Sequence, residues 1–143
     1  MHATVPPILL THDNHRRLTR LIAHHEAGPL AEAAELLELE LDRAELIEAT
    51  QIPPNVVTMH SRVIFEDVET GQWREAELVY PHEADAERAK ISVLAPVGTA
   101  LLGLTTEQRI EWPMPGARSR TLRVVRVVYQ PEAAAPAVAA TVG

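Results

Sequence analysis

The sequence contains no cysteine among its 143 residues. Disulfides, thiolate zinc sites, iron–sulfur clusters and cysteine nucleophiles are therefore excluded. It also lacks any apolar run near the ~20 residues that a membrane-spanning helix needs. Pro6 and Pro7 break the short apolar stretch near the start, and charge follows that stretch instead of preceding it, unlike a signal peptide. We therefore expect a cytoplasmic protein that makes no contact with a membrane.

Positive charge is in deficit, with 13 Lys and Arg against 20 Asp and Glu and a net charge of −7. This balance argues against a protein that holds nucleic acid by neutralising phosphates, so we expect no sequence-specific nucleic-acid binding. The charge is unevenly placed. Residues 1–52 hold four arginines against nine carboxylates, whereas residues 109–126 hold five arginines against Glu111 alone. The two regions are predicted to form surfaces with different roles.

The first third of the chain has helical periodicity. Apolar residues at three- and four-residue spacing predict a helix over residues 13–27, and a second over residues 29 to about 49. The second helix has a heptad seam, formed by Leu30, Ala34, Leu37, Leu41 and Ala44. Because so short a link joins the two helices, they are predicted to form an antiparallel hairpin, a short coiled coil over residues 1–52.

Pro53 and Pro54 end this helical part, since neither can donate a backbone hydrogen bond. The β-rich texture that follows predicts strands over residues 56–60, 62–68, 73–80, 91–94, 109–112 and 121–129. A change of phase in the last run indicates a bulge or a strand covered on both sides. Turns are expected at Thr70-Gly71 and Pro115-Gly116, and a two-turn helix over residues 96–102. The fold class is therefore α+β.

The final residues are rich in Ala, Pro and Val and poor in large side chains. They are predicted to form a disordered tail over residues 131–143. The domain organisation is thus expected to be a hairpin over 1–52, a β-rich domain over 53–130 and this tail.

Few residues suggest chemistry. His12, Asp13 and His15 could share one turn of helix, but a metal site needs further ligands, so we expect no metal. Phosphate-binding glycine motifs and the G-x-S-x-G motif are absent. The carboxylates of the second helix fit a solvated face, and the five aromatic residues are expected in the core. The arginines from Arg118 to Arg126 could face phosphate, an acidic protein surface or solvent.

Five sequence blocks occur in an order and spacing that is specific. They are VVTMHSRVIF (56–65), ELVYP (77–81), ISVLAPVGTALLGL (91–104), EWPMPG (111–116) and VVYQPEAA (127–134). Together they resemble the C-terminal domain of the Gre transcription elongation factors, and more closely the related regulator of nucleoside diphosphate kinase (Rnk) family. The resemblance reaches back through ELDRAE (40–45) into the hairpin.

The resemblance implies an N-terminal coiled coil followed by an FKBP-like domain, in which an antiparallel sheet curls around one short helix. In Gre factors this domain docks on RNA polymerase at the rim of the secondary channel, and acidic residues at the coiled-coil tip hold the catalytic magnesium for transcript cleavage. Here the first helix of about 15 residues spans roughly 22 Å and is shorter than in Gre factors. The tip at residues 27–30 carries no carboxylate, and residues 106–108 replace the usual Gly-Asp turn.

We therefore expect a non-enzymatic transcription regulator that binds RNA polymerase near its secondary channel without transcript-cleavage activity, and that affects elongation and nucleoside diphosphate kinase levels. No catalytic residue or cofactor is expected, and the protein is expected to be a monomer. The docking candidates are Pro96, Val97, Gly98, Leu101, Leu102, Arg118, Arg120 and Arg123. The tip candidates are Glu26, Gly28, Pro29 and Glu32.

Two alternatives remain open. The FKBP-like fold allows a peptidyl-prolyl isomerase by analogy alone, although such a pocket needs several converging aromatics and the sequence has only 3%. The acidic hairpin could instead pair between chains, which would make the protein a self-associating interaction module.

Overall fold

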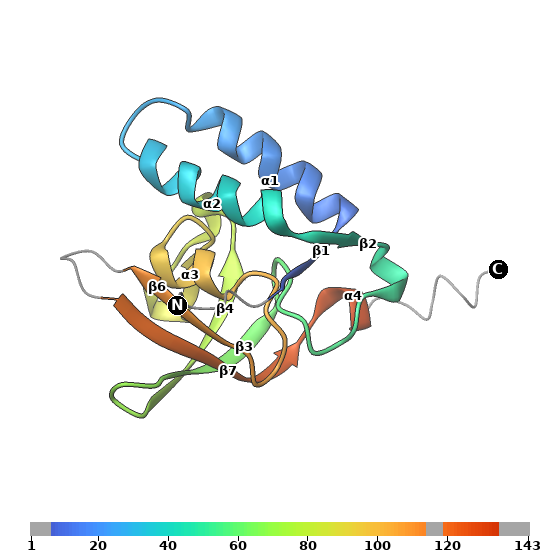
Figure 1. The fold of residues 1–143 in the computed structure, drawn as a ribbon, viewed down its shortest axis with the longest axis vertical. Coiled ribbons are helices and arrows are strands. Elements are labelled where there is room, and N and C mark those ends of the chain that lie inside the picture. Colours follow the sequence, from blue (N-terminus) through green and yellow to red (C-terminus); the bar gives the residue numbers. More distant parts are fainter. Residues whose placement is uncertain (1–6, 114–118, 135–143) are drawn as a thin grey trace, which may run out of the picture.

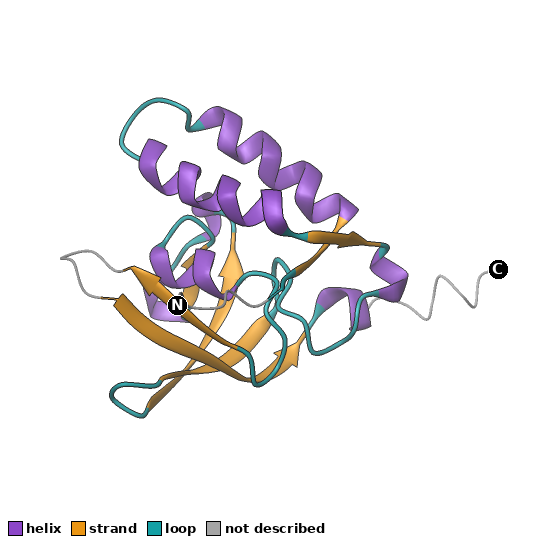
Figure 2. Ribbon diagram, viewed as in Figure 1, coloured by secondary structure: helices purple, strands orange, loops and turns teal. Residues whose placement is uncertain are grey.

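Two helices in the first third of the chain form the predicted antiparallel hairpin (Figures 1 and 2). The computed structural model describes residues 7–113 and 119–134. α1 (His12–His24) begins where the Thr11 hydroxyl accepts a hydrogen bond from the Asn14 N–H at 3.0 Å. α2 is Ala31–Arg43. Both helices are shorter than the predicted ranges, the second by six residues at its C-terminal end.

A pair of short strands replaces the predicted end of the second helix. β1 (Leu9–Thr11) precedes α1, and β2 (Glu45–Ile47) follows α2 and pairs with β1 in parallel. The Glu45 N–H donates to the Ile8 carbonyl at 3.0 Å. The prediction of helix as far as residue 49 is therefore wrong, because pairing with a distant segment outweighs local helical propensity.

The β-rich half forms one curled five-stranded sheet in the order β5-β4-β3-β7-β6 (Figures 1 and 2). Its strands are β3 (Arg62–Asp67), β4 (Gln72–Val79), β5 (Lys90–Ser92), β6 (Arg109–Pro113) and β7 (Ser119–Tyr129). The predicted sheet was antiparallel, but it is mixed, because β4 and β5 pair in parallel. Register shifts between β3 and β7 confirm the predicted bulge.

Short helices fill the connections of the sheet. The helix predicted over residues 96–102 is confirmed as α3 (Pro96–Leu101), which starts with proline as expected. Three 3₁₀ turns are η1 (Ala49–Gln51), η2 (Pro81–Glu83) and η3 (Ala86–Arg88). The Thr70-Gly71 turn joins β3 to β4, whereas the turn expected at Pro115-Gly116 lies outside the described residues.

The strand predicted over residues 56–60 is wrong. Only one isolated bridge forms there, between Val56 and Thr105. The Ser61 hydroxyl accepts from the Thr58 N–H at 2.9 Å and so offers the backbone a turn in place of a ladder. Residues 56–59 are all buried, so the alternation typical of a half-exposed strand is absent.

The hairpin and the sheet share one hydrophobic core. The continuous cluster includes Leu18, Leu37 and Leu41 of the hairpin together with Phe65 and Leu101 of the β-rich half. Most of the heptad seam therefore packs in this chain's own core, whereas Leu30 at its start is 37% exposed. A buried polar contact adds to the link, since the Asn14 side-chain oxygen accepts from the Met59 N–H at 3.1 Å.

Three of the five aromatic side chains are in the core, as predicted, and two are not. Phe65, Tyr80 and Trp112 are buried, but Trp73 is 56% exposed and Tyr129 is 51% exposed. Trp73 lies opposite Glu66 and Tyr129 opposite Arg62 across β3, on its outer face. Strand periodicity alone does not reveal which face of a sheet is covered.

The start of the predicted disordered tail is ordered. α4 (Pro131–Ala134) is a single helical turn, and residues 135–143 lie outside the described part. The adjacent Gln130 is 3% exposed, and its side-chain amide donates to the carbonyls of Pro53 and Val56 at 2.8 and 2.9 Å. Glu132 accepts from the Thr58 hydroxyl at 2.7 Å. The end of β7 therefore holds the 53–61 loop in place.

We expect Gln130→Ala to lower the free energy of unfolding by roughly 1–3 kcal/mol, because it leaves two loop carbonyls without their donor. Thermal and urea denaturation would measure the loss. Gln51→Ala, at an exposed position of η1, is the matched control and should change stability by less than about 0.5 kcal/mol. Equal stability of the two variants would contradict the role assigned to the Gln130 amide.

Candidate functional site

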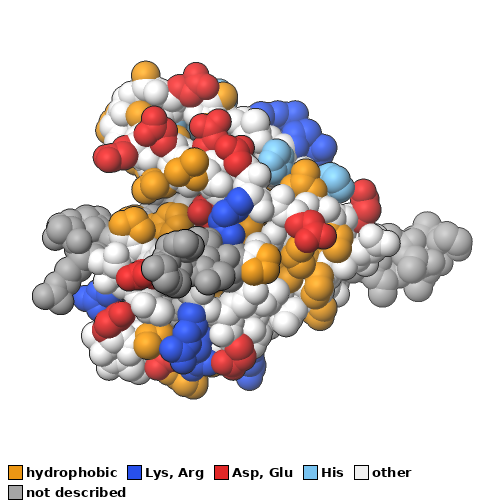
Figure 3. Space-filling model, in the orientation of Figure 1, with side chains coloured by type: hydrophobic (Ala, Val, Ile, Leu, Met, Phe, Trp, Pro, Cys, Tyr) orange, Lys and Arg blue, Asp and Glu red, His pale blue; other side chains and the backbone are white. Residues whose placement is uncertain are grey.

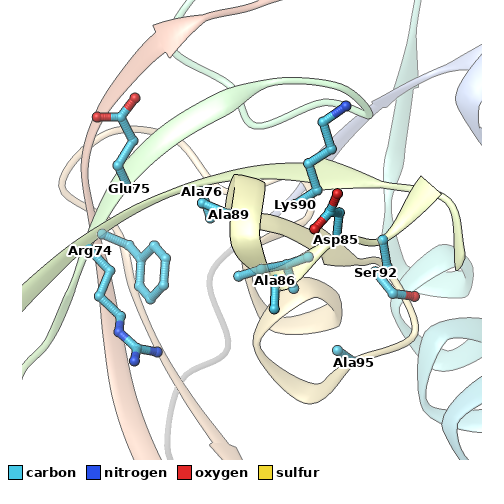
Figure 4. Close-up of a pocket in the computed structure, with 12 residues that line it drawn as sticks. Arg74, Glu75, Ala76, Asp85, Ala86, Ala89, Lys90, Ser92 and Ala95 are labelled. Atoms are coloured by element: carbon cyan, nitrogen blue, oxygen red, sulfur yellow. The ribbon is translucent and has the colours of Figure 1, made fainter.

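A large hollow lies on the concave side of the sheet, between β4, η3 and β5 (Figure 4). We call it the sheet groove; its volume is about 720 Å³. Its lining includes five alanines, at 76, 84, 86, 89 and 95, and a single aromatic residue, Phe65. Small side chains leave space that a partner could fill. The converging aromatics that an isomerase pocket needs are not present in this lining.

Local backbone features shape this groove. Alternation along β4 places Arg74 on the same face as the buried Ala76. Ala89 ends η3 in the left-handed conformation with φ 57°, and its carbonyl accepts from the Glu77 N–H at 2.8 Å. The chain thereby turns from η3 into β5, which brings Lys90 to the rim.

Two cations flank the alanine-lined floor. Arg74 lies toward one end and Lys90 toward the other (Figure 4). Within residues 7–113 and 119–134, no carboxylate lies within ion-pair distance of either side chain. Asp85, also in the lining, has Arg88 at 3.7 Å. The sheet groove therefore suits a segment with small apolar side chains and negative charge.

A second hollow of about 390 Å³ continues past Phe65 and Arg74. It contains two of the predicted docking residues, Val97 and Arg120. Arg120 is hydrogen-bonded to Asp67, so its charge is already compensated. The structure thus places Val97 beside the sheet groove, where its half-buried side chain can be contacted.

Predicted tip and docking residues meet in a third hollow, which we call the tip groove. It lies between the hairpin tip, α3 and β6, and has a volume of about 370 Å³. Pro29 and Glu32 line it from the hairpin, and Pro96 and Trp112 from the domain. The hairpin tip therefore faces the domain across this hollow. The other two tip candidates, Glu26 and Gly28, are exposed.

Three predicted docking residues cannot contact a partner because they are buried. Gly98, Leu101 and Leu102 all belong to the interior around α3. A Cβ atom at Gly98 would lie 2.1 Å from the Ser92 carbonyl oxygen, so only glycine fits there. These three residues shape the domain behind its surface, and docking of this region on polymerase stays a prediction.

The predicted arginine stripe is largely used within the molecule. Arg123 lies between Glu66, at 2.8 Å, and Glu107, at 2.7 Å. The hydrogen bond to Glu66, with a further contribution from Glu107, raises the pKa of the Arg123 guanidinium above its usual value. Arg118 lies outside the described residues. The stripe therefore offers an acidic partner much less free charge than its sequence suggests.

Within the described part of the chain, no group of three or more His, Cys, Asp or Glu side chains converges as metal ligands would. His12, part of the weighed metal motif, instead lies 3.4 Å from Glu48. No helix there is long and apolar enough to span a membrane.

Arg74 and Lys90, which flank the sheet groove, are not among the docking residues predicted from the sequence. One signal was available for Arg74: it shares the inward phase of β4 with Ala76 and Leu78, an unusual place for a charge. Lys90 had no such signal, because its position depends on the turn at Ala89.

Comparison with known proteins agrees with the resemblance. Residues 52–129 match the family described as transcription elongation factor GreA/GreB, C-terminal. The regulator of nucleoside diphosphate kinase of Escherichia coli K12 is 44% identical over 106 residues, 74% of this chain and 76% of that protein. GreA of Thermosipho melanesiensis is 38% identical over 81 residues, 57% of this chain and 51% of GreA.

A solved structure extends the likeness to the helical part. The prokaryotic transcription elongation factor GreA/GreB from Nitrosomonas europaea is 41% identical, with a TM-score of 0.67, and the match covers 87% of this chain and 99% of that one. Coverage of this extent reaches beyond residues 52–129 into the hairpin.

Proposed function

Because this chain belongs to the GreA/GreB C-terminal family, with the regulator of nucleoside diphosphate kinase as a relative, we propose that it is a non-enzymatic regulator that binds RNA polymerase near the secondary channel. The observation that carries the proposal is the shared domain fold over most of the chain. A protein with the same domain can compete with Gre factors for the same polymerase surface.

The sheet groove is the proposed contact with polymerase. Its alanines leave a hollow floor, and Arg74 and Lys90 add positive charge at the rim. A polymerase segment with small apolar and acidic side chains fits both features. Electrostatic attraction of this kind raises the association rate and weakens with salt.

The hairpin is proposed to decide what binding does. α2 carries five carboxylates against Arg43 alone, and acidic side chains gather over part of the hairpin in the space-filling view, with basic side chains at its other end (Figure 3). The negative charge of α2 suits a passage lined with basic groups. A bound hairpin would exclude the coiled coil of a Gre factor from the channel. An effect on nucleoside diphosphate kinase levels would then follow from altered transcription and not from contact with the kinase.

The direct test is retention of core RNA polymerase on the immobilised full-length protein, followed by competition with a Gre factor. We expect retention at modest salt, release as salt rises, and displacement by excess Gre factor. Failure to retain polymerase at modest salt would contradict the proposal.

We expect Ala86→Trp to weaken polymerase binding by about tenfold or more, because the indole would fill the sheet groove that the partner needs. Biolayer interferometry with core polymerase would measure the affinity. Ala49→Trp, at an exposed position of η1 outside the groove, is the matched control and should bind like the wild type. Equal weakening by both variants would place the contact elsewhere.

A further inference from the structure

A hollow of about 410 Å³ lies where α1 passes the end of β4 and the start of η2. We call it the α1 hollow. Arg17, Arg20 and His24 line it from successive turns of one helix face, and His82 and Tyr80 line it from the other side. The fold thus brings together four basic side chains from distant parts of the sequence, in a protein whose net charge is −7.

These basic groups have few acidic partners. Within residues 7–113 and 119–134, Arg20, His24 and His82 have no carboxylate within ion-pair distance. Arg17 lies 3.8 Å from Asp13, but that carboxylate is engaged more closely by Arg16, at 2.6 Å. The α1 hollow therefore presents positive charge that the fold does not neutralise.

Tyr80 organises the basic groups. The Arg17 guanidinium lies over its ring, 5.2 Å from the centroid, and the His82 ring stacks with it at an interplanar angle of 17°. Burial raises the pKa of the Tyr80 hydroxyl, which therefore stays neutral at physiological pH. The ring holds the Arg17 guanidinium and the His82 imidazole in position without adding negative charge.

The nearby carboxylate of Glu83 is bound by other groups and does not pair with the basic side chains of the α1 hollow. Its carboxylate accepts from the Tyr80 N–H at 3.2 Å and lies 2.8 Å from His60 Nε2. Burial opposes ionisation of this carboxyl, but the hydrogen bonds from His60 and from the Tyr80 N–H outweigh it and lower the pKa of Glu83. Glu83 is therefore ionised and held by His60, and it fixes the turn that carries His82.

We propose that the α1 hollow binds the polyphosphate group of a small phosphorylated molecule. Two arginines with two imidazoles match the several negative charges of a di- or triphosphate better than the single charge of a carboxylate. Guanidinium groups also match phosphate geometry through paired hydrogen bonds. This site does not depend on polymerase binding, because it lies apart from the sheet groove.

The test is titration calorimetry of the full-length protein with inorganic tripolyphosphate at low salt and neutral pH. We expect saturable binding with one site per chain. Arg20→Gln should weaken it by about tenfold or more, since it removes a charge-assisted contact. Arg126→Gln removes the same charge at an exposed position outside the hollow, and should change affinity by about twofold or less.

Three results would overturn the proposal. Absence of saturable binding would remove the site, and equal weakening by Arg126→Gln and Arg20→Gln would reduce it to general electrostatics. Tighter binding of hexaglutamate or of a short single-stranded oligonucleotide than of tripolyphosphate would assign the α1 hollow to a macromolecular partner. Melting curves of both variants, whose changed residues are exposed, verify that the fold is intact.

Discussion

Leu37→Asp is expected to unfold the whole protein in one transition. Leu37 is fully buried in the core that the hairpin shares with the sheet. A carboxylate there has no partner, and such burial costs several kcal/mol, a large fraction of the roughly 5–15 kcal/mol that stabilises a small domain. The halves are also tied together by the Asn14–Met59 contact and by the Leu9 N–H, which donates to the Gly103 carbonyl at 3.1 Å, so loss of the hairpin core should carry the sheet with it.

Circular dichroism and thermal denaturation would measure this loss. Leu39→Asp is the matched control, because Leu39 lies on the same helix but is 61% exposed, so its replacement should change stability by less than about 0.5 kcal/mol. A variant that lost helical signal but kept a cooperative β-sheet melt would show that the halves fold separately. The proline pair at 53–54 divides the chain between the hairpin and the sheet and so favours separate folding, whereas the shared core argues for one folding unit.

Elements with strong local patterns could be predicted from the sequence. The two helices follow from apolar spacing, and α3 from the proline at its first position. The errors fall where a specific hydrogen-bonded contact, and not the apolar pattern, decides the backbone path. α2 stops at Arg43 because the next residues pair with β1, and residues 56–60 form a turn because Ser61 and Thr58 bond to each other. Local periodicity contains no information on either contact.

The candidate site was harder to predict because the most recognisable motif is structural. In the block APVGTALLG, Gly98 allows α3 to approach Ser92, and the buried Thr99 hydroxyl is hydrogen-bonded to the Val93 carbonyl. Close packing and a buried hydrogen bond restrict which residue types fit at these positions, but they place no side chain at the surface. The motif therefore identifies the family correctly, whereas its buried residues act by shaping the domain behind its surface.

The charge pattern misled in a similar way. Arg120 and Arg123 look available in the sequence, but pairing of β3 with β7 brings Glu66 opposite Arg123 and brings Asp67, opposite Leu122, within ion-pair distance of Arg120. Arg74 and Lys90 look unremarkable, yet the fold leaves them free beside the sheet groove. Net charge along a segment therefore says little about which charges a partner can reach, because cross-strand neighbours decide that.

Backtracked transcription complexes given this protein are expected to release no additional short 3′ RNA. The resemblance to Gre factors implies that transcript cleavage needs an acidic tip at the catalytic magnesium. The tip at residues 27–30 of this chain carries no carboxylate. α1 has 13 residues, which span about 20 Å. Glu32, the acidic residue nearest the tip on α2, lines the tip groove against Pro96.

The measurement is release of labelled RNA from stalled complexes, with a Gre factor at equal concentration as the positive control. Added to that control, this protein should slow cleavage, since the proposed function is competition for the same surface. The uncharged tip and the short hairpin are two separate reasons for inactivity, and Ala27→Asp distinguishes them. This variant places a carboxylate at the tip without lengthening the hairpin, so it should remain inactive if hairpin length is limiting. Cleavage stimulated by the wild-type protein would overturn the prediction, because it would show that neither the short hairpin nor the uncharged tip prevents transcript cleavage.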